Sequence, residues 1–532
     1  MINSILIANR GEIACRIIRT AKKLGIKSYV IYSTEDESSL AVKLADKAFL
    51  LKSACSEKKE YLDGEQIISI AQKNKIEAIH PGYGFLSENS NFAKLVEDTG
   101  IKFIGPPYKA IEIMGDKIIS KKHAKNIDVS TIPGLQDEIK SYEDAIKAAD
   151  KIGFPLMIKA SAGGGGKGMR IVYEKKELKD KFKSAKNEAE TSFGDSRVFI
   201  EKFIEEPRHI EIQIVGDQFG NYLHLGERDC SIQRRNQKII EESPSPFIDT
   251  KIRDLMAGQA IALAKSVNYF SAGTVEFIVD KNKDFYFLEM NTRLQVEHPV
   301  TEMVTGIDLV EMMIRIASKE KLNLKQSEIS FNGSAIEARV YAEDPARDFM
   351  PSAGRLIKYK SPEQFSSKSE IIRNDTGVFE GSTISLHYDP MISKLCAWSE
   401  KRNKTIELLI NAINKFSIDG IKNNLNFLSA ILINKNFNKG TFSTKFLEME
   451  YPNGFKSYQL NKNELCKLSA AVLAIYKNYE ILTQTDEKKI IKTELSDFNF
   501  FVDTGLDQFS LSWNIRNGTH EISGTNNINF NV

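Results

Sequence analysis

The sequence predicts a mixed α/β and α+β protein of several domains, and three observations support this fold class. Short apolar runs alternate with amphipathic segments over the first 115 residues. A stretch of four glycines, residues 163–166, lies between two strand-like runs, and alternating strands follow from about residue 198. With 532 residues the chain has room for about three or four domains.

Composition excludes several classes of protein. The hydrophobic fraction of 42% and the charged fraction of 27% are typical of a soluble globular chain, and a net charge of +2 predicts no nucleic-acid partner. Five scattered cysteines without a CxxC pair argue against a zinc site or a disulfide framework. Because no signal peptide or long apolar run is present, we expect a cytoplasmic protein with no membrane partner.

The first 115 residues have the βαβ pattern of a parallel, doubly wound sheet. Residues 4–8 and 27–33 are expected strands, and the amphipathic segment 11–25 between them is an expected helix that ends at Gly25. The turn after the first strand, "ANRGEIA", has one glycine where a nicotinamide-binding fingerprint needs three. The sequence therefore disfavours a dinucleotide-binding domain.

The glycine run in "IKASAGGGGKGMRIVY" is predicted to be a flap between two strands. A P-loop would lead into a helix, whereas "MRIVY" reads as a strand. Glycine backbone N–H groups can lie against phosphate oxygens, and Lys117 and Lys159 would add positive charge. The alternative is an ordinary surface turn.

A hairpin in "TVEFIVDKNKDFYFLEMN" is predicted to carry a metal site. If Asp280 pairs with Phe285, Glu276 lies directly opposite Glu289, with Cβ atoms about 5 Å apart. Asn291 would project from the same face. Two carboxylates and an amide suit Mg²⁺ or Mn²⁺, although a solvent-facing acidic pair is the alternative and a one-residue error in the turn would separate the carboxylates.

The segment "NTRLQVEHPVTE" follows this hairpin and offers a cation, an amide and a possible base. If the strand continues, Arg293, Gln295 and Glu297 recur at period two and share one face. Lys238 in "ERDCSIQRRNQK" would add charge for holding a small oxyanion, although either segment alone is also typical of a surface salt-bridge run. His209 alone is more typical of a structural hydrogen bond than of catalysis.

These segments together resemble the biotin carboxylase component of biotin-dependent carboxylases, which are ATP-grasp enzymes. The resemblance rests on "IANRGEIA", "HPGYGFLSEN", "MGDK", "IKASAGGGGKGMR", "PRHIEIQI", "ERDCSIQRRNQK", "FLEMNTRLQVEHPVTE" and "YDPMISKL", in the family's order over residues 1 to about 448. It implies an N-terminal domain (1–115), an ATP-grasp domain (116–330) with a mobile lid (about 131–203), a mixed α+β C-terminal carboxylase domain (331–448) and a partial helix-plus-strand linking domain (449–532).

The resemblance also implies a reaction, in which ATP, bicarbonate and biotin give ADP, phosphate and N-carboxybiotin through carboxyphosphate. Two Mg²⁺ or Mn²⁺ ions would be held by Glu276, Glu289 and Asn291. The residues that would bind ATP are Lys117, Lys159, Gly163, Gly164, Gly165, Gly166, Met169, Glu201, Lys202, Phe203, Ile204, His209, Gln233, Asn236, Glu276, Ile278 and Glu289.

The same resemblance assigns the carboxylation chemistry. Bicarbonate would be bound by Lys238, Arg293, Gln295 and Val296, and Glu297 would be the base that removes its proton. Carboxyphosphate would release CO₂, and the remaining phosphate would deprotonate biotin. Arg339 would stabilise the enolate-like oxygen of biotin, as in an oxyanion hole, with Tyr83 near the biotin ring. The catalytic set is thus Lys238, Arg293, Glu297 and Arg339.

Two features resemble one subgroup, the α chains of propionyl-CoA carboxylases. Asn236 stands where free-standing acetyl-CoA-type subunits have histidine, and "STKFLEMEYPNGFKSYQL" resembles the join to a linking domain that docks on a carboxyltransferase β subunit. An ordinary C-terminal α+β appendage is the alternative. The Ala-Met-Lys-Met motif that accepts biotin does not occur in the sequence. We therefore expect a truncated chain or a separate carrier domain, and a homodimer or a larger α/β assembly.

Other functions remain open at this point. One alternative is that the chain is the biotin carboxylase subunit of an acetyl-CoA, methylcrotonyl-CoA or pyruvate carboxylase. A second alternative is a different ATP-grasp ligase that acts on an amine. A third alternative, of another class, is an inactive scaffold for assembly.

Overall fold

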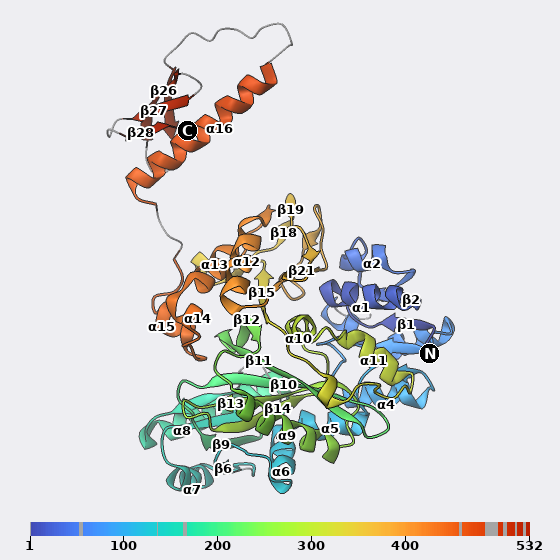
Figure 1. The fold of residues 1–532 in the computed structure, drawn as a ribbon. Coiled ribbons are helices and arrows are strands. Elements are labelled where there is room, and N and C mark those ends of the chain that lie inside the picture. Colours follow the sequence, from blue (N-terminus) through green and yellow to red (C-terminus); the bar gives the residue numbers. More distant parts are fainter. Residues whose placement is uncertain are drawn as a thin grey trace. The chain divides into compact units, whose positions relative to one another are not determined.

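The computed structural model describes residues 2–52, 57–135, 137–162, 168–456, 460–484, 498–503, 508–516, 519–524 and 528–531. The chain divides into two compact units, Met1–Phe455 and Lys456–Val532. Many of their elements are labelled in Figure 1. All predicted site residues belong to the first unit.

The first unit begins with a five-stranded parallel sheet in the order β3-β2-β1-β4-β5. Its strands are β1 (Ser4–Ile7), β2 (Lys27–Tyr32), β3 (Lys47–Leu50), β4 (Ala78–His80) and β5 (Lys102–Phe103). Its helices are α1 (Gly11–Lys23), α2 (Leu40–Leu44), α3 (Gly64–Lys73) and α4 (Ser90–Asp98), with 3₁₀ turns η1 (Thr34–Asp36) and η2 (Glu57–Leu62).

This sheet is covered on both faces, as the doubly wound prediction requires. Ile5 and Ile7 of β1 pack in one core with α1, whereas Leu6 packs in another core with α3 and α4. Alternate residues of a strand point to opposite faces, so the all-apolar run "ILI" is explained by burial on both sides. The short edge strand β3 was not predicted, because its residues are only partly buried and show no strong pattern.

A nine-stranded antiparallel sheet dominates the rest of the unit, in the order β14-β13-β10-β11-β12-β15-β23-β21-β20. Its strands are β10 (Arg208–Gly216), β11 (Tyr222–Arg234), β12 (Gln237–Ser243), β13 (Ser271–Val279), β14 (Phe285–Asn291), β15 (Ser334–Tyr341), β20 (Phe365–Ser366), β21 (Glu370–Thr376) and β23 (Met391–Ser399). The β12–β15 ladder joins strands from both sides of residue 330, where a domain boundary is expected from the resemblance.

One face of this sheet packs on helices and the other is polar. Ile210, Ile212 and Phe277 form a core with α5 (Tyr108–Gly115), α6 (Lys117–Asn126) and α9 (Thr250–Ser266). The alternate residues of β10 and β13 therefore lie on the opposite face. That polar face carries the candidate site.

A separate antiparallel sheet contains the strands that flank the glycine run, in the order β6-β9-β7-β8. The strands are β6 (Gly134–Leu135), β7 (Leu156–Ala160), β8 (Arg170–Val172) and β9 (Val198–Lys202), with helices α7 (Tyr142–Ile152) and α8 (Leu178–Phe193) and the turn η3 (Lys175–Glu177). Leu156 pairs with Val172, so the predicted strands on either side of the glycine run are confirmed.

The remaining elements of the first unit are mostly helices and short ladders. The helices are α10 (His298–Thr305), α11 (Leu309–Ala317), α12 (Arg402–Asn414), α13 (Leu425–Ile433), α14 (Lys435–Lys439) and α15 (Phe446–Glu450), with turns η4 (Gln326–Glu328) and η5 (Pro345–Arg347). The two-stranded ladders are β16 (Glu343–Asp344) with β17 (Met350–Pro351), β18 (Gly354–Arg355) with β22 (Thr383–Ile384), and β19 (Lys358–Lys360) with β24 (Ser417–Asp419).

The second unit has a long helix, α16 (Lys462–Gln484), and a four-stranded antiparallel sheet. Its strands are β25 (Phe498–Asp503), β26 (Gln508–Arg516), β27 (Thr519–Gly524) and β28 (Ile528–Asn531). The expected combination of a helix with strands is present in this unit. No helix within the described residues is both long and apolar enough to cross a bilayer.

Candidate functional site

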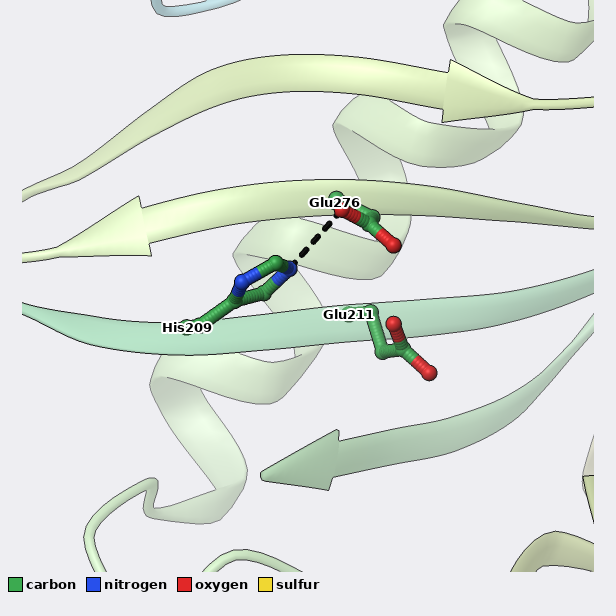
Figure 2. Close-up of side chains that lie close together, drawn as sticks. All are labelled: His209, Glu211 and Glu276. Atoms are coloured by element: carbon green, nitrogen blue, oxygen red, sulfur yellow. Dashed lines mark hydrogen bonds and ion pairs between the residues drawn. The ribbon is translucent and has the colours of Figure 1, made fainter. Parts of the chain in front are cut away.

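The centre of the site is the polar face of β10 and β13, which brings His209, Glu211 and Glu276 together (Figure 2). Glu211 pairs in register with Glu276 across the two strands. His209 Nε2 lies 2.8 Å from Glu276 Oε2. Burial alone would lower the pKa of His209, but the Glu276 carboxylate outweighs it and raises that pKa.

The predicted pairing of Glu276 with Glu289 is confirmed, but the predicted route to it is wrong. Phe285 pairs with Val279, not with Asp280, so the turn is one residue out of the expected register. A β-bulge between Phe287 and Glu289 then adds one residue to β14 and brings Glu289 opposite Glu276. Without the bulge the two carboxylates would point to opposite faces.

Oxygen ligands for a cation gather around Glu276. Asn291 Nδ2 donates to Glu276 Oε1 at 2.9 Å, so the amide is on the expected face. Glu289 Oε2 lies 3.4 Å from Lys117 Nζ. Burial would raise the pKa of Glu276, but Lys238 and His209 hold it well below its ordinary value, so the carboxylate is charged. Charged carboxylates and an amide oxygen fit a hard divalent cation.

Lys238 joins this cluster to the predicted base. Its Nζ donates to Glu211 Oε2 at 2.6 Å, to Glu276 Oε1 at 3.0 Å and to Glu297 Oε1 at 2.5 Å. Burial would lower the pKa of Lys238, but these carboxylates hold it well above its ordinary value. A fixed ammonium therefore lies between the predicted metal ligands and the predicted base.

Glu297 is fully buried and is held from two sides. Arg339 Nη2 donates to Glu297 Oε2 at 2.9 Å and also contacts Glu241. Burial and Glu211 would raise the pKa of Glu297, but Lys238 and Arg339 lower it overall. Glu297 is therefore a charged carboxylate at neutral pH and is able to accept a proton.

The segment after β14 reaches the site by a different geometry from the predicted one. The strand ends at Asn291, so Arg293, Gln295 and Glu297 do not form a period-two face. Their side chains still converge. Arg293 Nη1 donates to Gln295 Oε1 at 2.9 Å, and Gln295 Nε2 donates to Glu276 Oε1 at 3.1 Å. Val296 lies between Gln295 and Glu297 in the sequence, and its carbonyl accepts a hydrogen bond from Lys394 Nζ.

A second cluster of charges connects β7 and β9 with helix α6. Lys159 and Lys121 both contact Glu201. Burial would raise the pKa of Glu201, but the two ammonium groups outweigh it and lower that pKa to about 2. Lys121 was not predicted as a site residue.

Other residues that the resemblance assigns to ATP binding lie around this cluster. Lys202 Nζ donates to the Phe154 carbonyl at 2.8 Å, and the Phe203 N–H donates to the Pro155 carbonyl at 3.1 Å. Ile204 lies between β9 and β10, and Met169 lies just before β8. The predicted phosphate-binding glycines Gly163, Gly164, Gly165 and Gly166 lie outside the described residues.

Three further predicted nucleotide contacts lie on two strands of the large sheet and in one of its turns. Gln233 Nε2 donates to His209 Nδ1 at 2.8 Å, and Ile278 pairs with His209 across β10 and β13. Asn236 occupies the exposed turn between β11 and β12 with φ +65°. Asparagine tolerates this left-handed conformation better than most residues, which gives it a backbone role at this position.

Tyr83 belongs to the N-terminal sheet region. Asn9 Nδ2 donates to its carbonyl at 2.7 Å, and the ring lies 5.9 Å from Lys394 Nζ. Its buried hydroxyl has no hydrogen-bond partner within the described residues. A buried polar atom of this kind points to a ligand or to water.

Several buried charges of the site were not identified from the sequence. Arg228 and Glu211 are both fully buried and are joined by a hydrogen bond of 2.5 Å from Nε to Oε1. Glu211 follows His209 at period two in "HIEIQ", and that spacing is the signal that would have placed it in the site. Arg228, Glu241 and Lys394 have no such signal, because strand faces of β11, β12 and β23 are not evident from the sequence.

Three family models match the chain in succession. They are the biotin carboxylase N-terminal domain over residues 1–111, the ATP-binding domain of the carbamoyl-phosphate synthase L chain over 116–325, and the biotin carboxylase C-terminal domain over 337–449.

Relatives and solved structures agree with these models. The propionyl-CoA carboxylase alpha chain of Ruegeria pomeroyi is 51% identical over 496 residues, which is 90% of this chain and 73% of the relative. The mitochondrial alpha chain of Homo sapiens is 49% identical over 94% of this chain and 69% of its own length. The biotin carboxylase domain of Hydrogenobacter thermophilus 2-oxoglutarate carboxylase, in complex with MgADP, ADP and bicarbonate, superposes with a TM-score of 0.83 at 45% identity, covering 86% of this chain and all of that one. The chain belongs to the biotin carboxylase family, among the propionyl-CoA carboxylase alpha chains.

Proposed function

We propose that this chain carboxylates biotin with ATP and bicarbonate, as the alpha subunit of a propionyl-CoA carboxylase. The single observation that carries the proposal is Lys238, whose ammonium is bonded at once to Glu276 of the predicted metal site and to Glu297, the predicted base. This arrangement brings the nucleotide end and the bicarbonate end of one reaction to the same cation. The similar Hydrogenobacter thermophilus domain binds MgADP and bicarbonate.

In this proposal the nucleotide lies over the polar face of β10 and β13. Glu276, Glu289 and Asn291 would hold two divalent cations, Mg²⁺ or Mn²⁺, which would supply positive charge to the phosphates. Lys117 and Lys159 contribute further positive charge. The other ATP contacts are Met169, Glu201, Lys202, Phe203, Ile204, His209, Gln233, Asn236, Ile278 and the four glycines of residues 163–166.

Bicarbonate is proposed to lie beside Lys238, bound also by Arg293, Gln295 and Val296. Glu297 takes its proton, and the resulting oxyanion attacks the γ-phosphoryl group to give carboxyphosphate and ADP. A charged carboxylate that is fully buried is suited to this step, because burial shields it from bulk water.

Biotin is proposed to enter beside Arg339 and Tyr83. The Arg339 guanidinium stabilises the negative oxygen that forms when biotin loses its N1 proton. The hydroxyl of Tyr83 has no hydrogen-bond partner among the described residues, which supports a ligand near this ring. The biotin itself would be carried by a carrier domain that comes from further along the protein or from a separate chain.

The proposed partners follow from the relatives. A propionyl-CoA carboxylase alpha chain requires a carboxyltransferase, here a β subunit, and the Hydrogenobacter thermophilus domain is described as a dimer. The human relative is mitochondrial, so a cytoplasmic location stays a prediction.

The decisive assay measures ATP cleavage by the purified chain with Mg²⁺, bicarbonate and free biotin. We expect phosphate release to require both bicarbonate and biotin. The ATP-binding model that matches residues 116–325 is named for carbamoyl-phosphate synthase, so ammonium is the control acceptor. Cleavage that ignores biotin and responds to ammonium would favour an amine ligase, and no cleavage at all would favour an assembly scaffold.

The acyl substrate needs a second experiment. The carboxyltransferase that co-purifies with this chain is identified and tested with propionyl-CoA, acetyl-CoA and methylcrotonyl-CoA, and with pyruvate. Preferred carboxylation of propionyl-CoA supports the proposal, whereas preference for another acceptor reassigns the subunit.

A further inference from the structure

Lys394 of β23 is a fully buried lysine to which the proposed chemistry gives no role. It lies in the segment "YDPMISKL", and its relative exposure is 0%. An ammonium group in such a place is costly unless it is paired and hydrogen-bonded. The hydrogen-bond and ion-pair partners of Lys394 therefore indicate its role.

These partners come from three distant parts of the chain. Lys394 Nζ donates to the Val296 carbonyl at 2.8 Å, and it lies 3.3 Å from Glu12 Oε1 and 4.0 Å from Asp375 Oδ2. Glu12 belongs to α1, and Asp375 belongs to β21. Burial would lower the pKa of Lys394, but the nearby carboxylates outweigh it and raise that pKa, so the group is charged.

The contact with Val296 matters because residues 292–297 have no regular structure. Backbone hydrogen bonds of a helix or strand therefore do not fix the direction of this segment. Two of its backbone carbonyls, those of Gln295 and Val296, instead lie within hydrogen-bond distance of side chains. His298 Nδ1 lies 2.8 Å from the Gln295 carbonyl, and Lys394 holds the next one along.

The geometry connects this contact to the bicarbonate end of the site. The peptide bond is planar, so fixing the Val296 carbonyl also fixes the N–H of Glu297 and the plane from which that side chain leaves. Glu297 and Gln295 flank Val296 and both reach the Lys238–Glu276 cluster. Lys394 also pairs in register with Arg339 on β15.

We propose that Lys394 is a positioning residue: its ammonium holds the Val296 carbonyl and thereby sets the direction in which Gln295 and Glu297 face bicarbonate. This inference rests on the proposed function. It predicts that loss of Lys394 damages the use of bicarbonate and leaves the nucleotide contacts on β7, β9, β10 and β13 largely unaffected.

The test compares three variants of the whole chain. Lys394→Met removes the donor to Val296. Glu12→Gln keeps Lys394 and removes only one of its ion-pair partners. The double variant Glu12→Gln/Lys394→Met removes the lysine without leaving the Glu12 carboxylate stranded, so it folds more easily if the single change is too costly.

The measurements are the KM for bicarbonate in biotin-dependent ATP cleavage, the Kd for ATP by calorimetry, and the Tm. We expect Lys394→Met and the double variant to raise the bicarbonate KM by about tenfold to a hundredfold, because small displacements of reacting groups are costly. The Kd for ATP should stay within about twofold of wild type, a change too small to indicate a lost contact. Glu12→Gln should have a bicarbonate KM close to wild type.

Arg16→Met is the matched control. Arg16, on α1, is a buried cation like Lys394, but it contacts Glu302 and Asp308 and not residues 295–297. This variant should lower the Tm without a selective rise in the bicarbonate KM. An unchanged bicarbonate KM in folded Lys394→Met overturns the proposal, as does equal weakening of ATP binding or failure of both Lys394→Met variants to fold. If wild type shows no biotin-dependent cleavage, the proposed function itself has failed, which is a distinguishable result.

Discussion

At the scale of single residues, the site is built from buried carboxylates that are paired with cationic side chains. Glu211 and Glu297 are fully buried, and each is hydrogen-bonded to a cation at 2.5 to 2.9 Å. Removing one member of such a set leaves an uncompensated charge, which costs about 3 to 5 kcal/mol in known cases. The stability of each variant must therefore be measured together with its activity.

Arg339→Ser tests the residue proposed to stabilise the biotin oxyanion. We expect biotin-dependent turnover to fall by about a hundredfold or more, because a charged donor to the developing oxyanion is lost. The Kd for ATP should change little. Arg347→Ser is the control, since Arg347 is an exposed arginine in the same region, with a side-chain exposure of 79%. Equal losses in turnover and ATP binding would contradict the role assigned to Arg339.

Glu289→Gln tests the metal hairpin. The change keeps the shape of the side chain and removes one negative charge, so the Mg²⁺ concentration for half-maximal ATP cleavage should rise at least about tenfold. Asp284→Asn changes an exposed carboxylate on the same hairpin and should leave the Mg²⁺ dependence unaltered. An unaltered dependence in Glu289→Gln would remove this residue from the metal site.

The Glu201 carboxylate predicts a contribution to acid stability. Its pKa is about 2 in the folded protein, below its ordinary value of about 4.5, so the ionised form is favoured by folding. The contribution is fully present above about pH 4.5 and is lost as the pH falls from about 4.5 to 2. The Tm of Glu201→Gln should therefore fall less steeply over this range than that of wild type. Parallel Tm–pH curves would show that Lys121 and Lys159 do not stabilise the charged carboxylate.

At the scale of elements, α6 connects the site to the four-stranded sheet. Asp116, its N-cap residue, accepts hydrogen bonds from the Ile118 and Ile119 N–H groups at 2.9 Å. The same carboxylate accepts from Ser161 Oγ at 3.1 Å and from Arg197 Nη2 at 2.9 Å. One side chain therefore caps the helix that begins with Lys117 and ties it to the strands that flank the glycine run.

Replacing this cap gives a prediction for the element. Asp116→Ala should destabilise the fold by about 1 kcal/mol through the lost cap and should also raise the KM for ATP, because Lys117 is the first residue of α6. Asp116→Asn keeps a capping oxygen and should retain most of the stability. Ser141→Ala, which removes the cap of α7, is the control, and an equal rise in its ATP KM would deny a specific role to Asp116.

The elements also show how far the sequence predicts the fold. The doubly wound sheet and the β7–β8 hairpin follow from hydrophobic pattern and glycine placement, whereas the predicted opposition of Glu276 and Glu289 is correct only because a bulge offsets a one-residue error at the turn. The β-bulge in β14 does not follow from such patterns, since a bulge depends on the packing of Phe287 in the core beneath it and not on a local signal. The partners Arg228 and Glu241 were missed for a related reason: strand order, not sequence spacing, brings them to the site.

At the scale of the whole molecule, the described site residues all lie in the unit that ends at Phe455. A protein that stops there should retain biotin-dependent ATP cleavage with a kcat within about twofold of the full chain, since every described site residue is kept. It should no longer bind the carboxyltransferase if the second unit is the linking domain. Pull-down and phosphate release from the same preparation check both statements, and a truncated protein that is folded but inactive would contradict the first.

The continuous nine-stranded sheet has a consequence for the construction of chimaeric enzymes. Ile240 and Glu242 of β12 pair with Ala338 and Ile336 of β15, so the two sides of residue 330 share one ladder of backbone hydrogen bonds. A hybrid whose parents are joined at residue 330 would place foreign side chains against each other along this ladder. With a junction near Phe455, where the compact unit ends, both strands of each described pair come from the same parent protein.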